Sequence, residues 1–240
     1  DEDINYNVDF IPGRKMEKLK LNINNLIALN YWEKFTKKEY SFIKQLFTGQ
    51  NQSIIKCSKC NYKNNSFEIF QNLQLNIEET NTNIYNCLDS YIKVEQLDRD
   101  NKIYCNFCFC KNRALKSNMI WKPPKVLIIN FKRFKYNNFG LLQAKNNKFI
   151  KYPIKNLNIK QYISPDSPHI NNYNYNLFGV NIHKSLGSDN SINFGHYISC
   201  VKNRFDNKWY IFDDSNVRRA QFNDIVNKDA YLLFYLRNDN

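Results

Sequence analysis

Short runs in which apolar and polar residues alternate are the main feature of the hydrophobic pattern. In the run 66–77, Phe70, Leu73, Leu75 and Ile77 largely alternate with polar neighbours, which is typical of a strand with one buried face. Similar short segments follow at 122–134, 175–183, 195–203, 208–215 and 230–237. The pattern therefore predicts a protein built mainly from short strands.

Two other stretches have the spacing of helices. Residues 31–50 place apolar side chains mostly at helical intervals, and Gly49 marks a stop. Residues 85–97 are predicted to form a short helix. The stretch between Leu19 and Leu29 fits either a helix or a strand.

The order of these elements indicates an α+β protein with an antiparallel sheet. Strands dominate, and neither a βαβ rhythm nor an internal repeat is present. Residues 160–174 are rich in turn-forming residues and are predicted to be a loop. We expect a polar, asparagine-rich segment at 1–30 and a folded unit at 31–240.

Composition narrows the class of protein. Of 240 residues, 42% are hydrophobic and 15% are aromatic, which suffices for a buried core and excludes a wholly disordered chain. Apolar runs such as 126–129 are far shorter than the roughly 20 residues of a membrane span. The first residues lack the features of a secretion signal, so no membrane association is expected.

The formal net charge of +13 comes from 35 basic and 22 acidic residues. A strongly basic surface is often a site for nucleic acid. Here the basic residues are mostly single, with no run of five or six. A solvated surface is therefore the favoured interpretation, and a nucleic-acid partner is not expected.

Cysteine spacing predicts a metal site. Two C-x-x-C pairs each turn two thiolates toward one cation, and together they complete the tetrahedral sulfur shell that Zn2+ prefers. The predicted ligands are Cys57, Cys60, Cys105 and Cys108. Cys110 competes as a fourth ligand, and the alternative to a metal site is a set of unconnected thiols. A closed four-cysteine site is structural, and reduced thiolates favour the cytoplasm or nucleus.

His196 and two aspartates lie on runs that are predicted to form a hairpin. With the turn centred at 205–206, Asp213 becomes the diagonal neighbour of His196, whereas a shift of one residue places Asp214 opposite. Either carboxylate would orient the imidazole and stabilise its cation. The pattern fits both a structural hydrogen bond and a catalytic pair. Gly195 favours catalysis, because a glycine lets another backbone approach closely.

In their order and spacing, these motifs resemble those of the ubiquitin-specific proteases, papain-like cysteine deubiquitinases with fingers, palm and thumb. The resemblance covers about residues 31–237 and rests on LFTGQNQSIIKCSKC, FEIFQNLQLNI, NCLDSYIKVEQL, IYCNFCFCKNRALKSNMIWKPPKVLIINFKRF, GHYISCVKN, WYIFDDSNV and AYLLFYLR. Each segment alone has low specificity, whereas their order is specific. The implied fold is an antiparallel palm sheet with zinc-ribbon fingers at about 50–120 and most of the helical thumb absent.

The resemblance also implies roles for individual residues. It makes His196 the general base, Asp213 its orienting partner and Asp214 an assisting polar group. Gly195 and Tyr197 match positions beside a narrow channel for the Gly-Gly tail of ubiquitin. The four paired cysteines match the zinc site of the fingers, and the implied partners are ubiquitin and ubiquitinated proteins.

The nucleophilic cysteine of the family, found in a box of the type GNTCYMNS, does not occur in residues 1–240. Cys87 fits a small buried hydrophobe, Cys110 adjoins the metal pair, and Cys200 lies about 13 Å along a strand from His196. We therefore expect a thiol-dependent deubiquitinase that is inactive as this chain alone. The alternative is an inactive, zinc-stabilised ubiquitin-binding or scaffold module.

Two further points follow from the resemblance. His183 matches a recurrent histidine near the tail groove, and a structural role is expected for it. The motifs specify neither the ubiquitin linkage nor whether the modifier is ubiquitin or a ubiquitin-like protein.

Overall fold

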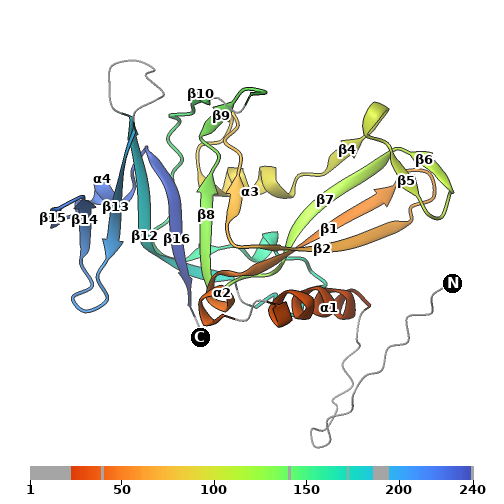
Figure 1. Ribbon diagram of the computed structural model, residues 1–240, viewed down its shortest axis with the longest axis horizontal. Coiled ribbons are helices and arrows are strands. Elements are labelled where there is room, and N and C mark those ends of the chain that lie inside the picture. Colours follow the sequence, from red (N-terminus) through yellow and green to blue (C-terminus); the bar gives the residue numbers. More distant parts are fainter. Residues whose placement is uncertain (1–22, 39–40, 140–141, 172, 186–194, 239–240) are drawn as a thin grey trace, which may run out of the picture.

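The computed structural model describes residues 23–38, 41–139, 142–171, 173–185 and 195–238. A large sheet, which we call the palm, lies at one side, and a smaller elongated sheet, which we call the fingers, extends away from it (Figure 1). Both sheets are mainly antiparallel. The α+β class predicted from the hydrophobic pattern is therefore confirmed.

The palm is an eight-stranded sheet with β12 near its centre. Only the short β3 runs parallel to its neighbour, β8. In spatial order the strands are β15 (Asn216–Arg219), β14 (Trp209–Asp213), β13 (Gly195–Lys202), β12 (Asn174–Ser185), β16 (Ala230–Arg237), β8 (Val126–Phe131) and β3 (Leu73–Leu75), and β11 (Leu157–Asn158) also pairs with β12.

Alternating apolar side chains of the palm strands fill one large core. Leu127 and Ile129 on β8 and Leu233 and Tyr235 on β16 are buried, so the period of two locates the inner face of the sheet. Side chains from α3 (Ile84–Ile92) and from the segment 150–163 complete the same cluster. The predicted loop at 160–174 begins with the short 3-10 helix η2 (Lys160–Tyr162).

Helix α3 begins near the predicted position and ends earlier than predicted. The Asn83 side chain accepts hydrogen bonds from the backbone of Tyr85 and Asn86, which caps the helix. The sequence predicted a helix as far as residue 97, but Glu95–Leu97 form β4 and pair with β7 (Ala114–Lys122). Pairing with this long strand satisfies the backbone hydrogen-bonding groups of β4. Local helical spacing carries no information about this distant pairing.

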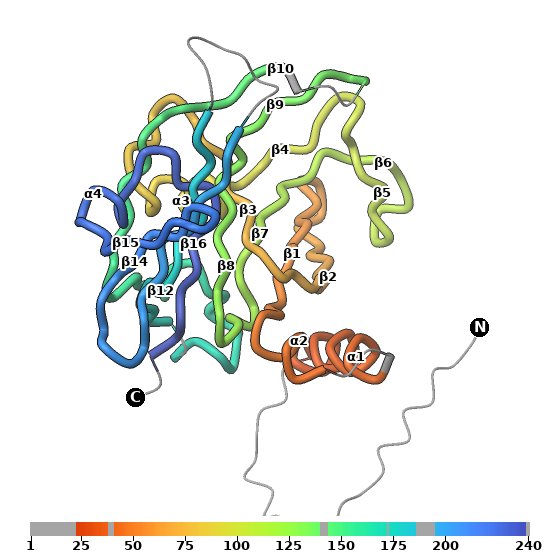
Figure 2. Tube along the Cα trace, turned by 60° about the vertical axis from the view of Figure 1, so that its left-hand side comes forward, coloured from red at the N-terminus to blue at the C-terminus, as the bar shows by residue number. Residues whose placement is uncertain are grey.

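The fingers consist of a four-stranded sheet and a terminal hairpin. The sheet order is β2 (Lys63–Phe70), β1 (Gly49–Cys57), β7 and β4. After the 3-10 helix η1 (Arg99–Asn101), β5 (Ile103–Cys105) and β6 (Cys110–Asn112) form the hairpin. Figure 2 shows this hairpin at the far end of the fingers from the palm.

Two helices, rather than one, precede the fingers: α1 (Ile23–Lys38) and α2 (Phe42–Phe47). Ala28 of α1 is buried with Phe67 and Trp121, and the Gln50 side chain donates to the Ala28 carbonyl at 3.0 Å. The boundary expected at residue 30 falls inside α1, because packing on the fingers sheet stabilises a helix in a segment of polar composition.

The remaining elements lie around the palm. β9 (Phe134–Tyr136) and β10 (Leu142–Lys145) form a separate hairpin, and α4 (Phe222–Ile225) follows β15. In the part of the chain that the structure describes, no helix has the length and apolar character needed to cross a bilayer.

Candidate active site and metal centre

His196 and Asp213 are brought together by the hairpin of β13 and β14. Ser199 pairs with Phe212 and Lys202 pairs with Trp209, which is the register predicted for a turn centred at 205–206. His196 Nε2 lies 2.6 Å from Asp213 Oδ1, the short distance expected of a charge-assisted hydrogen bond. The predicted diagonal contact is therefore present.

Asp214 also lies close to the imidazole. It occupies the tight turn between β14 and β15, where Asp213 pairs with Asn216 and Asp214 adopts a φ of 51°. Aspartate tolerates this left-handed conformation better than most residues. Asp214 Oδ2 lies 3.8 Å from His196 Nε2, so the turn places both carboxylates near one ring nitrogen, one in contact and one farther away.

The contact with Asp213 assigns the tautomer of His196. Nε2 donates its proton to the carboxylate, which leaves the lone pair on Nδ1. No hydrogen bond joins Nδ1 to another of the described residues, and the side chain is 31% exposed. The site therefore offers an oriented imidazole whose basic nitrogen is available to a reacting group.

Lys184 is a site residue that the sequence reasoning did not identify. It lies directly across from His196 on β12, and its ammonium nitrogen is 3.9 Å from Asp213 Oδ2. The register of β12 with β13 places it there, and no local pattern in the sequence specifies that register. His196, Asp213 and Asp214 also converge in the manner of metal ligands, but an ammonium beside Asp213 disfavours a second cation there.

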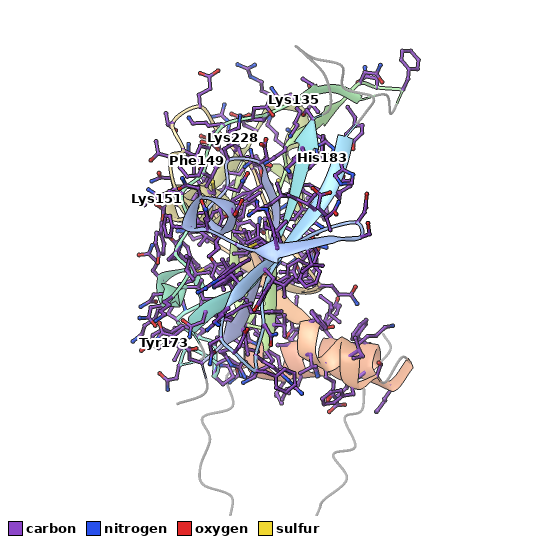
Figure 3. All side chains as sticks on the ribbon, turned by 90° about the vertical axis from the view of Figure 1, so that its left-hand side faces the viewer. Lys135, Phe149, Lys151, Tyr173, His183 and Lys228 are labelled. Carbon is purple, nitrogen blue, oxygen red and sulfur yellow. The ribbon has the colours of Figure 1, made fainter. Side chains whose placement is uncertain are left out.

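The side chain of His183 leaves no room for a Cβ at position 195, which is why a glycine is needed there. His183 lies on β12 (Figure 3), is buried, and its ring occupies the space where a Cβ on Gly195 would be. The sequence argument expected another backbone to approach Gly195, and the close neighbour is instead this imidazole ring. Burial and the nearby ammonium of Lys145 lower the pKa of His183, which keeps the ring neutral.

Aromatic rings continue the surface next to Gly195. Tyr197 is half-exposed, and its ring contacts the His183 ring with centroids 4.7 Å apart. Phe134 and Tyr231 close the cluster, each within ring-contact distance of two other members. Of the residues predicted to lie beside a channel, Gly195 therefore adjoins this aromatic cluster and Tyr197 belongs to it, which periodicity alone does not reveal.

Replacing Gly195 by alanine is expected to destabilise the palm by about 1–3 kcal/mol, because the new methyl group overlaps the buried His183 ring. Gly179→Ala is the matched control, since a Cβ there meets Phe234 at an ordinary 3.5 Å. Urea unfolding measures both. The double variant Gly195→Ala/His183→Ala is expected to be more stable than the single variant Gly195→Ala, because it lacks the ring that the new methyl group overlaps. A Gly195→Ala protein as stable as the control would contradict this packing.

The four paired cysteines converge at the fingertip. Cys57 and Cys60 lie at the turn between β1 and β2, and Cys105 and Cys108 lie at the turn between β5 and β6. Their sulfurs are 4.0 Å apart for the pair Cys57–Cys108 and 3.6 Å apart for Cys60–Cys105, and all four lie within 4.8 Å of one another. A tetrahedral Zn2+ with bonds of about 2.3 Å requires sulfurs ~3.8 Å apart, so the geometry fits.

The two turns have matching backbones. The N–H of Asn61 donates to the Cys57 carbonyl, the N–H of Phe109 donates to the Cys105 carbonyl, and both donors have a positive φ. This repeated turn aims the two thiols of each pair in the same direction. Cys110 pairs with Cys105 across the hairpin but is exposed and lies outside the sulfur cluster.

Proton affinities differ among the clustered thiols. A hydrogen bond from the backbone of Cys60 lowers the pKa of Cys57 to about 7. The thiol of Cys60 raises the pKa of Cys108 to about 12, and burial raises the pKa of Cys60. Sulfurs this close compete for protons unless a cation binds them. The donor set suits a metal ion with four thiolate ligands.

The other cysteines are not placed to react with His196. Cys87 in α3 and Cys200 in β13 are buried, and burial raises the pKa of both, to about 12 for Cys200. Cys110 accepts a hydrogen bond from the Asn112 side chain at the fingertip. Among the described residues, which include all the cysteines, no thiol is hydrogen-bonded to His196.

Residues 13–235 match the family model of ubiquitin carboxyl-terminal hydrolases. The chain belongs to the ubiquitin carboxyl-terminal hydrolase family. Probable ubiquitin carboxyl-terminal hydrolase R319 of Acanthamoeba polyphaga mimivirus is 34% identical over 234 residues, which cover 94% of this chain and 48% of the relative. Ubiquitin carboxyl-terminal hydrolase 2 of Gallus gallus is 31% identical over 207 residues, covering 85% of this chain and 55% of the relative. The chain thus spans about half the length of these two hydrolases.

Solved structures of the family show the same fold. The yeast SAGA DUB module with an Sgf73 mutant matches with a TM-score of 0.72 and 30% identity, covering 88% of this chain and 45% of that chain. The SAGA Ubp8/Sgf11/Sus1/Sgf73 DUB module bound to ubiquitin aldehyde matches with a TM-score of 0.71 and 31% identity, covering 90% and 48%. The resemblance to ubiquitin-specific proteases drawn from the motifs is confirmed.

Proposed function

We propose that this chain is the fingers and palm of a thiol-dependent deubiquitinase, which hydrolyses the peptide or isopeptide bond after the C-terminal glycine of ubiquitin. The contact of 2.6 Å between His196 Nε2 and Asp213 Oδ1 carries this proposal. The family supports it. The similarity to a module bound to ubiquitin aldehyde supports ubiquitin and ubiquitinated proteins as partners.

In this mechanism His196 is the general base and Asp213 orients it. Nδ1 of His196 takes the proton of a cysteine thiol, and the Asp213 carboxylate stabilises the resulting imidazolium. The thiolate attacks the carbonyl carbon, and the imidazolium returns the proton to the leaving amine as the C–N bond breaks. Water then attacks the thioester while His196 takes its proton, which releases the ubiquitin carboxylate and the thiol.

The remaining site residues support this chemistry. Asp214 adds a second carboxylate near Nε2 and assists as a polar group beside the ring. In this proposal Gly195 and Tyr197 border the path of the ubiquitin tail, and the path is a narrow channel that admits only a chain without side chains. Two glycines at the end of ubiquitin satisfy that restriction.

The fingertip cysteines hold a structural zinc ion in this proposal. Four thiolates leave no coordination position open, so the ion stabilises the fingers and takes no part in hydrolysis. Cys57, Cys60, Cys105 and Cys108 have the spacing and chemistry for it. Thiolate ligands of this kind require a reducing compartment, which favours the cytoplasm or the nucleus.

The attacking thiol comes from outside the seven cysteines of this chain. Four of these thiols form the metal cluster, Cys87 and Cys200 are buried, and Cys110 lies at the fingertip. An inactive ubiquitin-binding scaffold would use the same zinc-stabilised fingers, but it has no use for an imidazole oriented by a carboxylate. The enzyme is therefore the function we favour.

The chain alone is expected to bind ubiquitin without hydrolysing it, because it supplies the base and not the nucleophile. Calorimetric titration with ubiquitin measures binding, and release of the fluorophore from ubiquitin–aminomethylcoumarin measures hydrolysis. Hydrolysis abolished by replacing Cys87, Cys110 or Cys200 with serine would contradict the assignment of the thiol. Absence of ubiquitin binding would contradict the proposed partner.

A further inference from the structure

The fingertip exposes a cluster of aromatic side chains that the proposed hydrolysis does not use. Four rings gather around the two metal turns, and we call them the fingertip patch. Their exposed fractions range from 44% to 78%: Tyr62, Tyr104, Phe107 and Phe109. Exposed aromatic clusters of this kind usually mark a binding surface, since solvation of apolar rings is unfavourable.

Phe109 is also held in an unfavourable backbone conformation. Its φ is 53°, and the equivalent position of the other turn is Asn61 with a φ of 61°. Asparagine is common in this region, whereas a bulky aromatic residue is an outlier. A strained and exposed phenylalanine at a site suited to asparagine points to a function for the ring.

The same region carries unpaired positive charge. The segments 57–63 and 102–113 contain no acidic residue, and Asp98 and Asp100 are the nearest carboxylates in the sequence. The two segments carry five exposed cations, and none of them forms an ion pair with a described residue. They are Lys59, Lys63, Lys102, Lys111 and Arg113. The five positive charges exceed in magnitude the net charge of −2 on a zinc ion with four thiolates.

The patch also contains a small pocket between the two turns, lined by both apolar and polar residues. The pocket measures about 80 Å3, and its walls include Tyr62, Tyr104 and the amides of Asn64 and Asn106. The Tyr62 ring is nearly parallel to the Phe107 ring, at 14°, with centroids 6.3 Å apart. Flat faces, amide donors and acceptors, and surrounding ammonium groups are therefore present in one place.

We propose that the fingertip patch binds single-stranded nucleic acid. Bases stack on the exposed rings of the fingertip patch, Phe109 included, and the surrounding cations contact the phosphates. The sequence alone argued against such a partner because its cations are dispersed, but the fold collects five of them at the fingertip. An acidic peptide would use the cations without needing flat faces, and an anionic membrane would not need a pocket lined by amides.

The test uses the zinc-loaded chain and a fluorescein-labelled oligouridylate of about ten nucleotides, with binding followed by fluorescence anisotropy. Contacts to about three phosphates predict a slope near −2 in a plot of log K against log salt. Affinity is then expected to fall about 15-fold between ~50 and ~200 mM salt. This experiment does not depend on the proposed hydrolase activity.

Two variants separate stacking from charge. Tyr104→Ala is expected to weaken binding about tenfold, the effect of one stacked base. Phe109→Asn places the residue of the other turn at the strained position, so it is expected to retain zinc and stability while binding several-fold more weakly. Phe205→Asn is the matched control, because Phe205 is 83% exposed in the β13–β14 turn, outside the fingertip, and is expected to bind normally.

Several results would overturn the proposal. Undetectable binding at low salt would do so, as would equal binding by Tyr104→Ala, Phe109→Asn and wild-type protein. The proposal would also be overturned if a polyglutamate peptide or phosphatidylserine vesicles bound as tightly as the oligonucleotide and if the same variants lost that binding. Weakened ubiquitin binding in Phe109→Asn, with unchanged oligonucleotide binding, would assign the patch to ubiquitin instead.

Discussion

Replacing His196 by alanine in the full-length enzyme is expected to lower kcat/KM for a ubiquitin substrate by roughly 10²–10⁴-fold, the contribution of a positioned general base. Ubiquitin binding should change little, because the imidazole is a single side chain that is only 31% exposed. Release of aminomethylcoumarin measures turnover, and calorimetry measures binding. His169→Ala is the control, since His169 lies in a loop outside the site.

The two aspartates should differ in the same assay. Asp213 contacts the imidazole at 2.6 Å, whereas Asp214 lies 3.8 Å away and its side chain is 81% exposed. Asp213→Asn removes the charge that holds the catalytic tautomer and is expected to cost more activity than Asp214→Asn. Equal effects, or a larger effect of Asp214→Asn, would contradict the assignment of the orienting role to Asp213.

Removing the metal is expected to unfold the fingers before the palm. In the segments 57–63 and 103–112, the buried side chains are Cys57 and Cys105, so this end has almost no hydrophobic core of its own. Structural zinc sites contribute on the order of 10 kcal/mol to folding. After treatment with a chelator, hydrogen exchange should therefore accelerate in the finger strands β1, β2, β5, β6 and β7 while palm strands β12 and β16 stay protected.

Cysteine variants provide the matched control for the metal site. Elemental analysis of the purified chain should show one zinc per molecule. Cys105→Ser is expected to lose it and Cys110→Ser to retain it, because only the first belongs to the sulfur cluster. A chain that is metal-free yet shows protected finger amides would contradict a structural zinc site.

The sequence predicted those parts of the fold and site that depend on local pattern. Counting positions around a turn at 205–206 brought an aspartate to His196, and the resemblance to ubiquitin-specific proteases selected Asp213 over Asp214. The two C-x-x-C turns likewise fixed the four clustered sulfurs. Spacing within one motif therefore located both groups, although it left Asp214 and Cys110 open as alternatives.

Features that depend on distant pairing were not predictable in this way. Residues 95–97 became a strand because β7 pairs with them, although their local spacing suggested a helix. Lys184 and His183 reach the site through the pairing of β12 with β13, across a connection that no turn motif specifies. The fingertip patch arises because two separate turns meet at the cluster of four cysteines, which places dispersed aromatic and basic residues side by side.

We expect His196, oriented by Asp213, to serve a thiol from outside the seven cysteines of this chain. The most direct test is to label the full-length enzyme with a ubiquitin vinyl sulfone probe and identify the modified sulfur by mass spectrometry. The account predicts a single adduct on a cysteine outside this chain, and His196→Ala should slow its formation. An adduct on Cys87, Cys110 or Cys200 would contradict the account.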